Sequence, residues 1–216
     1  MALTRAEIAK ILSLGNPQKK TWATKPPAAS VPANRSIFIT DVGGWNGTTY
    51  AGSYWYSDGT IWHPVSGSVI LARSSTQVTA PGDTAENTLY TYSIAADLMG
   101  PTDSLRITTR WTYNNNANSK MTRIRIAATE LAGNIGANAY AGYNQAVITN
   151  RTINSQLAAI TTYVNTAQSL HSAINDPMRT GAVDMTAAQN LTITAQKATG
   201  GDTMALESVL IELLAG

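Results

Sequence analysis

Large and mostly apolar residues alternate with polar ones in the stretch Asp103-Ser-Leu-Arg-Ile-Thr-Thr-Arg-Trp-Thr-Tyr113. A period of two residues is typical of a half-buried β-strand, and one face would carry Leu105, Ile107, Thr109, Trp111 and Tyr113. The run Asn114-Asn-Asn-Ala-Asn118 predicts a turn, because asparagine tolerates left-handed backbone. Residues 120–130 then alternate again. The sequence therefore predicts a β-hairpin over residues 103–130.

Further strands are expected on both sides of this hairpin. The segment 202–214 is ambiguous, since Met204 to Glu207 favour a helix by propensity. We predict a closing strand there, because Gly200-Gly201-Asp202 precedes it and a β partner is needed. Long strands separated by polar turns indicate an all-β protein with a jelly-roll-like β-sandwich over residues 81–216. The other expected strands cover residues 68–73, 87–98, 145–153, 157–164 and 190–197.

Residues 36–80 predict a small β-meander rich in aromatic side chains. Tyr54-Trp-Tyr-Ser57 and Thr60-Ile-Trp-His63 flank Asp58-Gly59, which favours a type I′ turn. That turn would place Tyr56 opposite Ile61 and Trp55 opposite Trp62. Alternation separates the aromatic side chains between two faces, so one face is expected to be core and the other exposed. Exposed aromatic rings stack on sugar rings, and the ligand candidates in this region are Trp45, Tyr54 and Tyr56.

The first 35 residues predict a helix followed by an extended arm. Thr4 and Glu7 form a capping box, and Gly15 ends the predicted helix 3–15. Its apolar face packs either on its own domain or on a larger assembly. Four prolines between residues 16 and 35 disfavour helix and central strand, and this arm is basic: it carries Lys19, Lys20, Lys25 and Arg35.

Composition excludes several functional classes. Of 216 residues, 13% are charged, the net charge is +2 and cysteine is absent. A strong basic field for nucleic acid, disulfides, thiolate zinc sites and thiol nucleophiles are therefore not expected. No apolar run has the length of a signal peptide or a membrane span. Two histidines and scattered aspartates match no catalytic or metal motif, so we expect no enzyme, cofactor or metal.

Several segments resemble a module of tailed-bacteriophage fibre proteins. The resemblance rests on Phe38-Ile-Thr-Asp-Val-Gly43, on Gly52-Ser-Tyr-Trp-Tyr-Ser-Asp-Gly-Thr-Ile-Trp-His-Pro-Val65 and on Gly67-Ser-Val-Ile-Leu-Ala72. The later strands of residues 103–110 and 190–213 are similar to the β-sandwich tips of such fibres. The resemblance implies a short fibre, or a head- or tail-associated virion protein of a podophage-like particle. It would be non-enzymatic, homotrimeric and made in the host cytoplasm.

This resemblance implies partners and sites. Residues 1–35 would dock to portal, adaptor or capsid proteins of the virion, and the β-sandwich would face the host and bind a surface glycan. The attachment residues would be Leu3, Ile8, Ile11, Leu12, Lys19, Lys20 and Trp22. The ligand surface would add Asn114, Asn115 and Asn116 to the aromatic candidates.

Two alternatives to the fibre stay open. One is a capsid cement or decoration protein of the same fold, and the other is a carbohydrate-binding or carbohydrate-hydrolysing β-sandwich protein. The low charge content also favours an obligate oligomer, because sheets facing a threefold axis bury uncharged faces that a monomer would expose.

Overall fold

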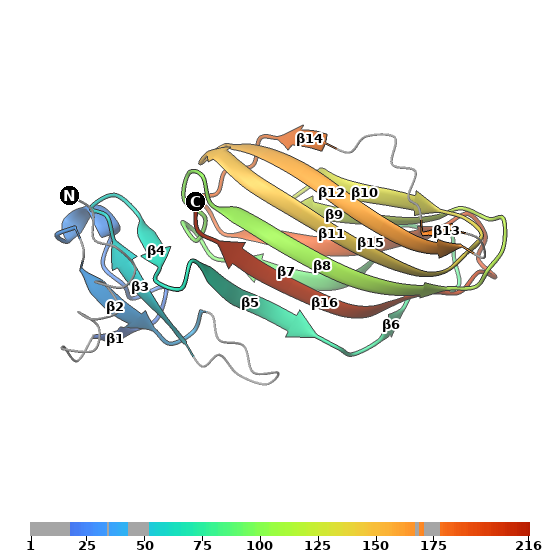
Figure 1. Ribbon diagram of the computed structural model, residues 1–216, viewed down its shortest axis with the longest axis horizontal. Helices are drawn as coiled ribbons and strands as arrows, with labels where there is room; N and C mark the ends of the chain where they lie inside the picture. The colour runs from blue at the N-terminus through green and yellow to red at the C-terminus, as the bar shows by residue number, and fades with distance from the viewer. Residues whose placement is uncertain (1–17, 34, 43–51, 167–168, 171–177) are drawn as a thin grey trace. The chain divides into compact units, whose positions relative to one another are not determined.

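The computed structural model describes residues 18–33, 35–42, 52–166, 169–170 and 178–216 (Figure 1). It divides into two compact units, residues 1–72 with 212–216, and residues 73–211. The predicted helix 3–15 lies outside the described residues.

The N-terminal unit contains a four-stranded sheet in the order β1-β2-β3-β4. β1 runs parallel to β2, and the other neighbours are antiparallel. A short 3₁₀ helix, η1, lies between the first two strands. The bounds are β1 Lys19–Lys20, η1 Ala28–Ser30, β2 Ser36–Ile39, β3 Ser53–Ser57 and β4 Trp62–Pro64.

The predicted extended arm folds onto this sheet. Trp22 is buried, and its ring meets the Trp55 ring edge-on with centroids 4.8 Å apart. The Trp62 indole N–H donates to the Pro26 carbonyl at 2.9 Å. Residues 18–33 therefore supply part of the core of the unit, and the expectation of an extended arm was wrong for them. Prolines shaped the path of this segment, but the large apolar area of Trp22 decided where it packs.

The remaining strands form a β-sandwich, which confirms the all-β, sandwich part of the predicted fold class (Figure 1). One sheet follows the order β13-β12-β11-β8-β16-β5, with β14 pairing β12 and β6 pairing β16; the other follows β10-β9-β15-β7. The strand bounds are β5 Ser68–Ser74, β6 Val78–Thr79, β7 Asn87–Ile94, β8 Ser104–Tyr113, β9 Lys120–Ile126, β10 Thr129–Gly136, β11 Ala139–Thr152, β12 Ser155–Thr166, β13 Ser169–Leu170, β14 Met178–Gly181, β15 Gln189–Lys197 and β16 Met204–Leu214.

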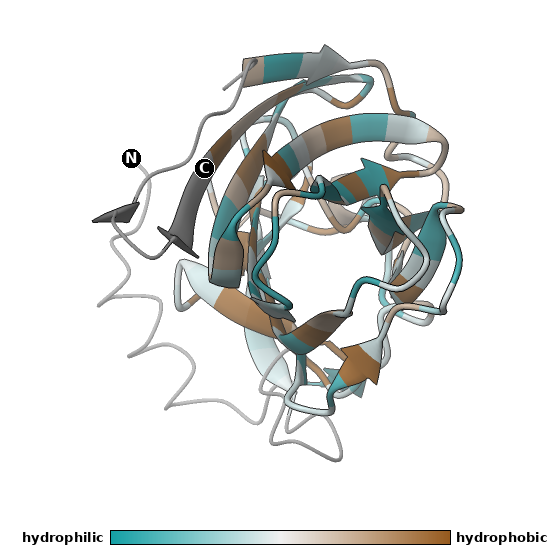
Figure 2. Ribbon diagram, turned by 90° about the vertical axis from the view of Figure 1, so that its right-hand side faces the viewer, coloured by the Kyte–Doolittle hydropathy of each residue, from teal (hydrophilic) through white to brown (hydrophobic). Residues whose placement is uncertain are grey.

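Alternate residues of both sheets form the apolar core. All five residues predicted for the inner face of residues 103–113 are buried. They face Ile124, Ile126, Leu191 and Ile193 of the other sheet, each at most 4% exposed. Figure 2 shows apolar and polar residues following one another along the strands. The closing strand predicted over residues 202–214 is also confirmed, as β16.

The predicted hairpin over residues 103–130 was wrong. β8 pairs with β11, whereas β9 pairs with β10 and β15, so residues 114–119 cross from one sheet to the other. The predicted return strand is itself a hairpin that turns at Ala127, whose φ is +53°. Both strands have an inward apolar face, and this pattern fits two facing sheets as well as it fits neighbours in one sheet.

The aromatic hairpin forms with a register two residues away from the predicted one. Ser57 pairs with Trp62, Tyr56 with His63 and Trp55 with Pro64. The Asp58 Oδ1 atom accepts the N–H groups of Thr60 at 2.7 Å and Ile61 at 2.8 Å. These two bonds close a longer loop over residues 58–61 in place of a two-residue turn.

Gly142 on β11 makes room for a buried tyrosine of β8. A Cβ atom at Gly142 would lie 2.7 Å from the Tyr113 hydroxyl oxygen, and burial raises the pKa of Tyr113. We expect Gly142→Ala to lower the free energy of unfolding by about 1–3 kcal/mol, because the core has to shift. Urea unfolding measures the change. Gly201→Ala is the control, since no atom lies within 4 Å of its added Cβ; equal losses in both variants would contradict the prediction.

Candidate functional site

One face of the small sheet carries a row of aromatic side chains. Phe38 of β2 stands beside Tyr54 of β3, and Tyr56 of β3 stands beside His63 of β4. The alternate residues of the same strands point the other way and are buried: Ile37, Ile39, Trp55, Ser57 and Trp62. We call Phe38, Tyr54, Tyr56 and His63 the aromatic face. The separation of Tyr54 and Tyr56 from Trp55 agrees with the sequence analysis.

The rings of the aromatic face contact one another in two pairs. Phe38 and Tyr54 meet edge-on, with centroids 4.8 Å apart and an interplanar angle of 65°. Tyr56 and His63 are stacked at 5.2 Å with an angle of 28°. Both are favourable arrangements for aromatic pairs. Tyr54 is 42% exposed, so its ring remains accessible although it packs on Phe38.

Asp58 orients the histidine of this face. Its Oδ2 atom lies 3.1 Å from His63 Nε2, next to the loop that its Oδ1 atom closes. Partial burial pushes the Asp58 pKa upward, but hydrogen bonds from Ile61, His63 and Thr60 outweigh this effect and hold the pKa below its ordinary value. Asp58 is therefore anionic at neutral pH, and its charge holds the imidazole against Tyr56.

The structure brings two sets of predicted residues to the same face. Lys19, predicted to attach the chain to a particle, is exposed and is the register neighbour of Phe38. Tyr54 and Tyr56 were predicted to bind a ligand. Lys20 lies beside Ile39, and the attachment role of both lysines stays a prediction.

Trp22 was predicted to attach the chain to a particle, but its side chain is buried. Its side chain belongs to the core of its own unit, which corrects its assignment as an attachment residue. The remaining predicted positions of the N-terminal segments lie outside the described residues: Leu3, Ile8, Ile11, Leu12 and Trp45. Sequence reasoning missed Phe38 and His63. The alternation of Phe38 with Ile37 and Ile39 is the signal that would have placed it on the outer face.

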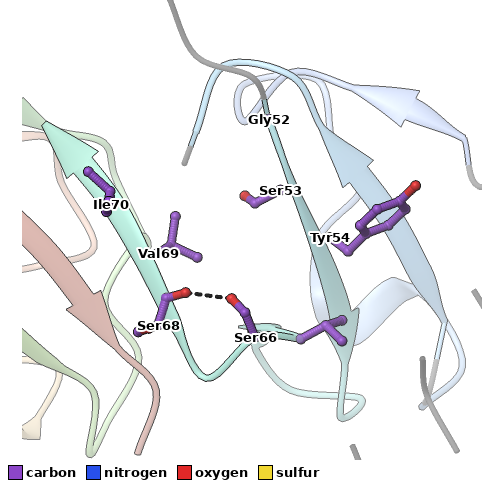
Figure 3. A pocket seen from close by; sticks show the side chains of 8 residues that line it. Gly52, Ser53, Tyr54, Ser66, Ser68, Val69 and Ile70 are labelled. Atoms are coloured by element: carbon purple, nitrogen blue, oxygen red, sulfur yellow. Dashed lines mark hydrogen bonds between the residues drawn. The ribbon is translucent and has the colours of Figure 1, made fainter. Parts of the chain in front are cut away.

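A shallow groove of about 420 Å³ lies along the edge of β3 (Figure 3). Its walls are Gly52, Ser53, Tyr54, Val65, Ser66, Ser68, Val69 and Ile70. Figure 3 shows the Tyr54 ring projecting away from Val69 and Ile70. The Ser66 hydroxyl donates to the Ser68 carbonyl, and the Ser53 hydroxyl donates to the Val42 carbonyl at 2.5 Å. The groove is therefore mainly apolar, because these hydroxyl groups are engaged within the chain.

Gly52 shapes the edge between the groove and the aromatic face. Its φ is +83°, and an added Cβ would lie 2.6 Å from the Ile39 carbonyl oxygen and from the Phe38 ring. Only glycine adopts this backbone conformation without strain. The close approach sets the position of Phe38 beneath Tyr54.

The predicted asparagine surface lies at one end of the sandwich, and most of its side chains point inward. The amides of Asn114, Asn116 and Asn118 all donate to the Asp202 Oδ1 atom, at 3.1, 2.5 and 3.2 Å. Hydrogen bonding, led by Asn116, holds the pKa of Asp202 below its ordinary value. Asn115 is the exposed member of the predicted trio. Asn114 and Asn116 thus serve the fold of this loop.

The described residues contain no cluster of three or more histidine or acidic side chains that could hold a metal. Within the same part of the chain, no helix is long and apolar enough to cross a membrane.

Comparisons with known proteins found no matching family model and no matching curated protein. Solved structures that resemble the chain include the CBM2 module of the evolved Dit of Lactobacillus casei BL23 phage J-1, with 10% identity, a TM-score of 0.33 and coverage of 56% of this chain and 67% of that one. Peanut lectin matches with 8% identity and a TM-score of 0.30, covering 89% of this chain and 94% of the lectin. A protein of unknown function from Shewanella oneidensis MR-1 matches with 8% identity and a TM-score of 0.32, covering 100% and 96%.

Proposed function

We propose that the chain is a non-enzymatic structural protein of a tailed-phage virion that binds a carbohydrate of the host surface through its aromatic face. The observation that carries the proposal is the exposed Tyr54 ring on a face of four rings that contact one another in two pairs. The sequence resemblance to phage fibre modules covers this same segment, from Phe38 to Val65.

Sugar binding follows from the chemistry of the aromatic face. A pyranose ring presents apolar C–H patches, and flat aromatic rings bury such patches well. The partly exposed Asp58 adds a carboxylate that accepts hydrogen bonds from hydroxyl groups at the edge of the rings. A neutral oligosaccharide is therefore the expected ligand.

In the proposed virion, the aromatic face binds the host and residues 1–35 attach the chain to the particle. In the proposed arrangement, the residues before β1 and the lysines of β1 dock to portal, adaptor or capsid proteins. The β-sandwich extends from the particle, and three copies associate. A cryo-EM map of the particle tests this arrangement and separates a fibre from a capsid decoration protein.

Removing one ring of the aromatic face tests the carbohydrate proposal. We expect Tyr54→Ala to weaken binding to neutral oligosaccharides about tenfold, since stacking of one aromatic ring contributes about 1 kcal/mol beyond its buried area. Tyr56→Ala should also weaken binding. Binding is measured on a glycan array of neutral hexose and N-acetylhexosamine oligosaccharides and then by calorimetry.

Tyr140→Ala is the matched control, because Tyr140 is 54% exposed and belongs to β11 of the other unit. It should bind as the unchanged protein does. Equal binding by Tyr54→Ala and Tyr140→Ala would refute the assignment of the site. Release of sugar from the glycans would refute the non-enzymatic role.

A further inference from the structure

A lysine, an asparagine and an aspartate meet inside one end of the sandwich. Asn116 belongs to the loop that crosses between the sheets, Lys120 begins β9 and Asp202 precedes β16. The side chains of Lys120 and Asp202 are only 1% and 3% exposed. Solvent is therefore almost completely excluded from both charged groups.

Short polar contacts connect the three side chains. Lys120 Nζ donates to Asn116 Oδ1 at 2.7 Å, which holds the amine against the carboxamide group. Asn116 Nδ2 donates to Asp202 Oδ1 at 2.5 Å. Asp202 Oδ2 has no hydrogen-bond partner and lies 3.9 Å from Lys120 Nζ. A single carboxylate thus stands beside both the amine and the amide nitrogen.

We propose that this triad forms an intramolecular isopeptide bond between Lys120 and Asn116. Asp202 Oδ2 removes a proton from the Lys120 ammonium group, and the free Nζ lone pair attacks Asn116 Cγ. The Nζ–Cγ bond forms and the Cγ–Nδ2 bond breaks. Asp202 passes protons to the departing Nδ2, which leaves as ammonium, and the carboxylate is regenerated.

The reaction is balanced without any further reactant. One lysine ammonium and one asparagine carboxamide become one secondary amide and one ammonium ion, with no change of oxidation state. The hydrogen bond from Lys120 to Asn116 keeps the amine next to the carboxamide, and this proximity favours the attack. Asp202 touches the leaving nitrogen and is the catalytic residue of the proposed step.

The bond would lock the loop that crosses between the sheets. The chain has no cysteine and therefore no disulfide available for this purpose. The product amide also removes the charge of a buried ammonium group, whose desolvation is costly. Lys197 is equally buried, but its described hydrogen bonds go to the carbonyls of Gly200 and Asp202, which are backbone groups.

Mass spectrometry of the purified full-length protein tests the proposal. The denatured protein should weigh one ammonia less than its sequence requires. Trypsin cleaves only after lysines with a free amine, so the peptide Trp111–Arg123 should remain uncut after Lys120 and carry the whole mass loss. A wild-type protein of full sequence mass that is cleaved after Lys120 would overturn the proposal.

Variants identify the participating groups. Lys120→Arg and Asn116→Ala should each have the mass of their own sequence, and Asp202→Asn should retain a cleavable Lys120. Lys197→Arg is the matched control and should still lack one ammonia. Bond formation in Asp202→Asn would contradict the role of the carboxylate. Circular dichroism reports whether each variant folds, and the wild-type measurement decides the main question without any variant.

Discussion

Trp55→Ala should lower the free energy of unfolding of the N-terminal unit by about 3–5 kcal/mol, the usual cost of emptying a buried tryptophan site. Trp55 is completely buried, its ring meets Trp22, and its indole N–H donates to the Ser53 hydroxyl at 2.7 Å. Residues 18–33, which pack through Trp22, should lose their contact with the sheet.

Hydrogen exchange measured by mass spectrometry checks this prediction locally. Peptides from residues 18–42 and 52–72 should exchange faster in Trp55→Ala, because their backbone opens more often. Tyr54→Ala is the control, since Tyr54 is the neighbouring residue on the opposite, partly exposed face. Unchanged exchange in the Trp55→Ala peptides would show that Trp55 does not hold this unit together.

Gln156→Leu should destabilise the sandwich by about 3–5 kcal/mol, because each buried polar group left without a partner costs about 1–3 kcal/mol. The Gln156 amide is fully buried and connects two segments. Its Nε2 donates to the Val183 carbonyl at 2.9 Å and to Asn150 Oδ1 at 3.1 Å, and its Oε1 accepts the Val183 N–H at 2.7 Å. Leucine has a similar volume and makes none of these bonds.

Urea unfolding compares this variant with Gln145→Leu. Gln145 is a half-buried residue of the same sheet whose amide donates to the Tyr143 hydroxyl at 3.1 Å. Its replacement should cost less than about 1 kcal/mol, as is usual outside the core. Similar losses in the two variants would mean that the Gln156 bonds contribute little.

A network of arginine–glutamate ion pairs lies on the outer surface of the β10-β9-β15-β7 sheet. Arg123 and Arg125 lie between Glu86 and Glu130, and nitrogen–oxygen distances are 3.0–3.1 Å. Arg179 of β14 also pairs with Glu130. The hydrogen bond from Arg125 lowers the pKa of Glu86. These partly exposed pairs connect three strands and a preceding loop.

Side-chain alternation explains why much of the fold was predictable. Residues 103–113 place each large apolar residue two positions from the next, and every predicted inner residue is buried. The same rule separated Tyr54 and Tyr56 from Trp55. Alternation is local, because it follows from the geometry of a single extended strand.

Strand pairing and register depend on contacts that alternation does not report. The asparagines of residues 114–118 indicated a turn, but their bonds to Asp202, far along the chain, belong to a crossing between sheets. Asp58 and Gly59 indicated a two-residue turn. Instead, the N–H groups of Thr60 and Ile61 donate to Asp58 Oδ1 and close a longer loop over residues 58–61.

The amino-acid sequence by itself determined that this is an all-β chain, which residues of the strand 103–113 face inward, and that Tyr54 and Tyr56 share a face opposite to that of Trp55. Only the tertiary structure decided that Trp22 is core, that β8 and β9 lie in different sheets, and that Phe38 and His63 complete the aromatic face. The physical reason is that the direction of a side chain follows from its own strand, whereas its partners are chosen by long-range burial and hydrogen bonding.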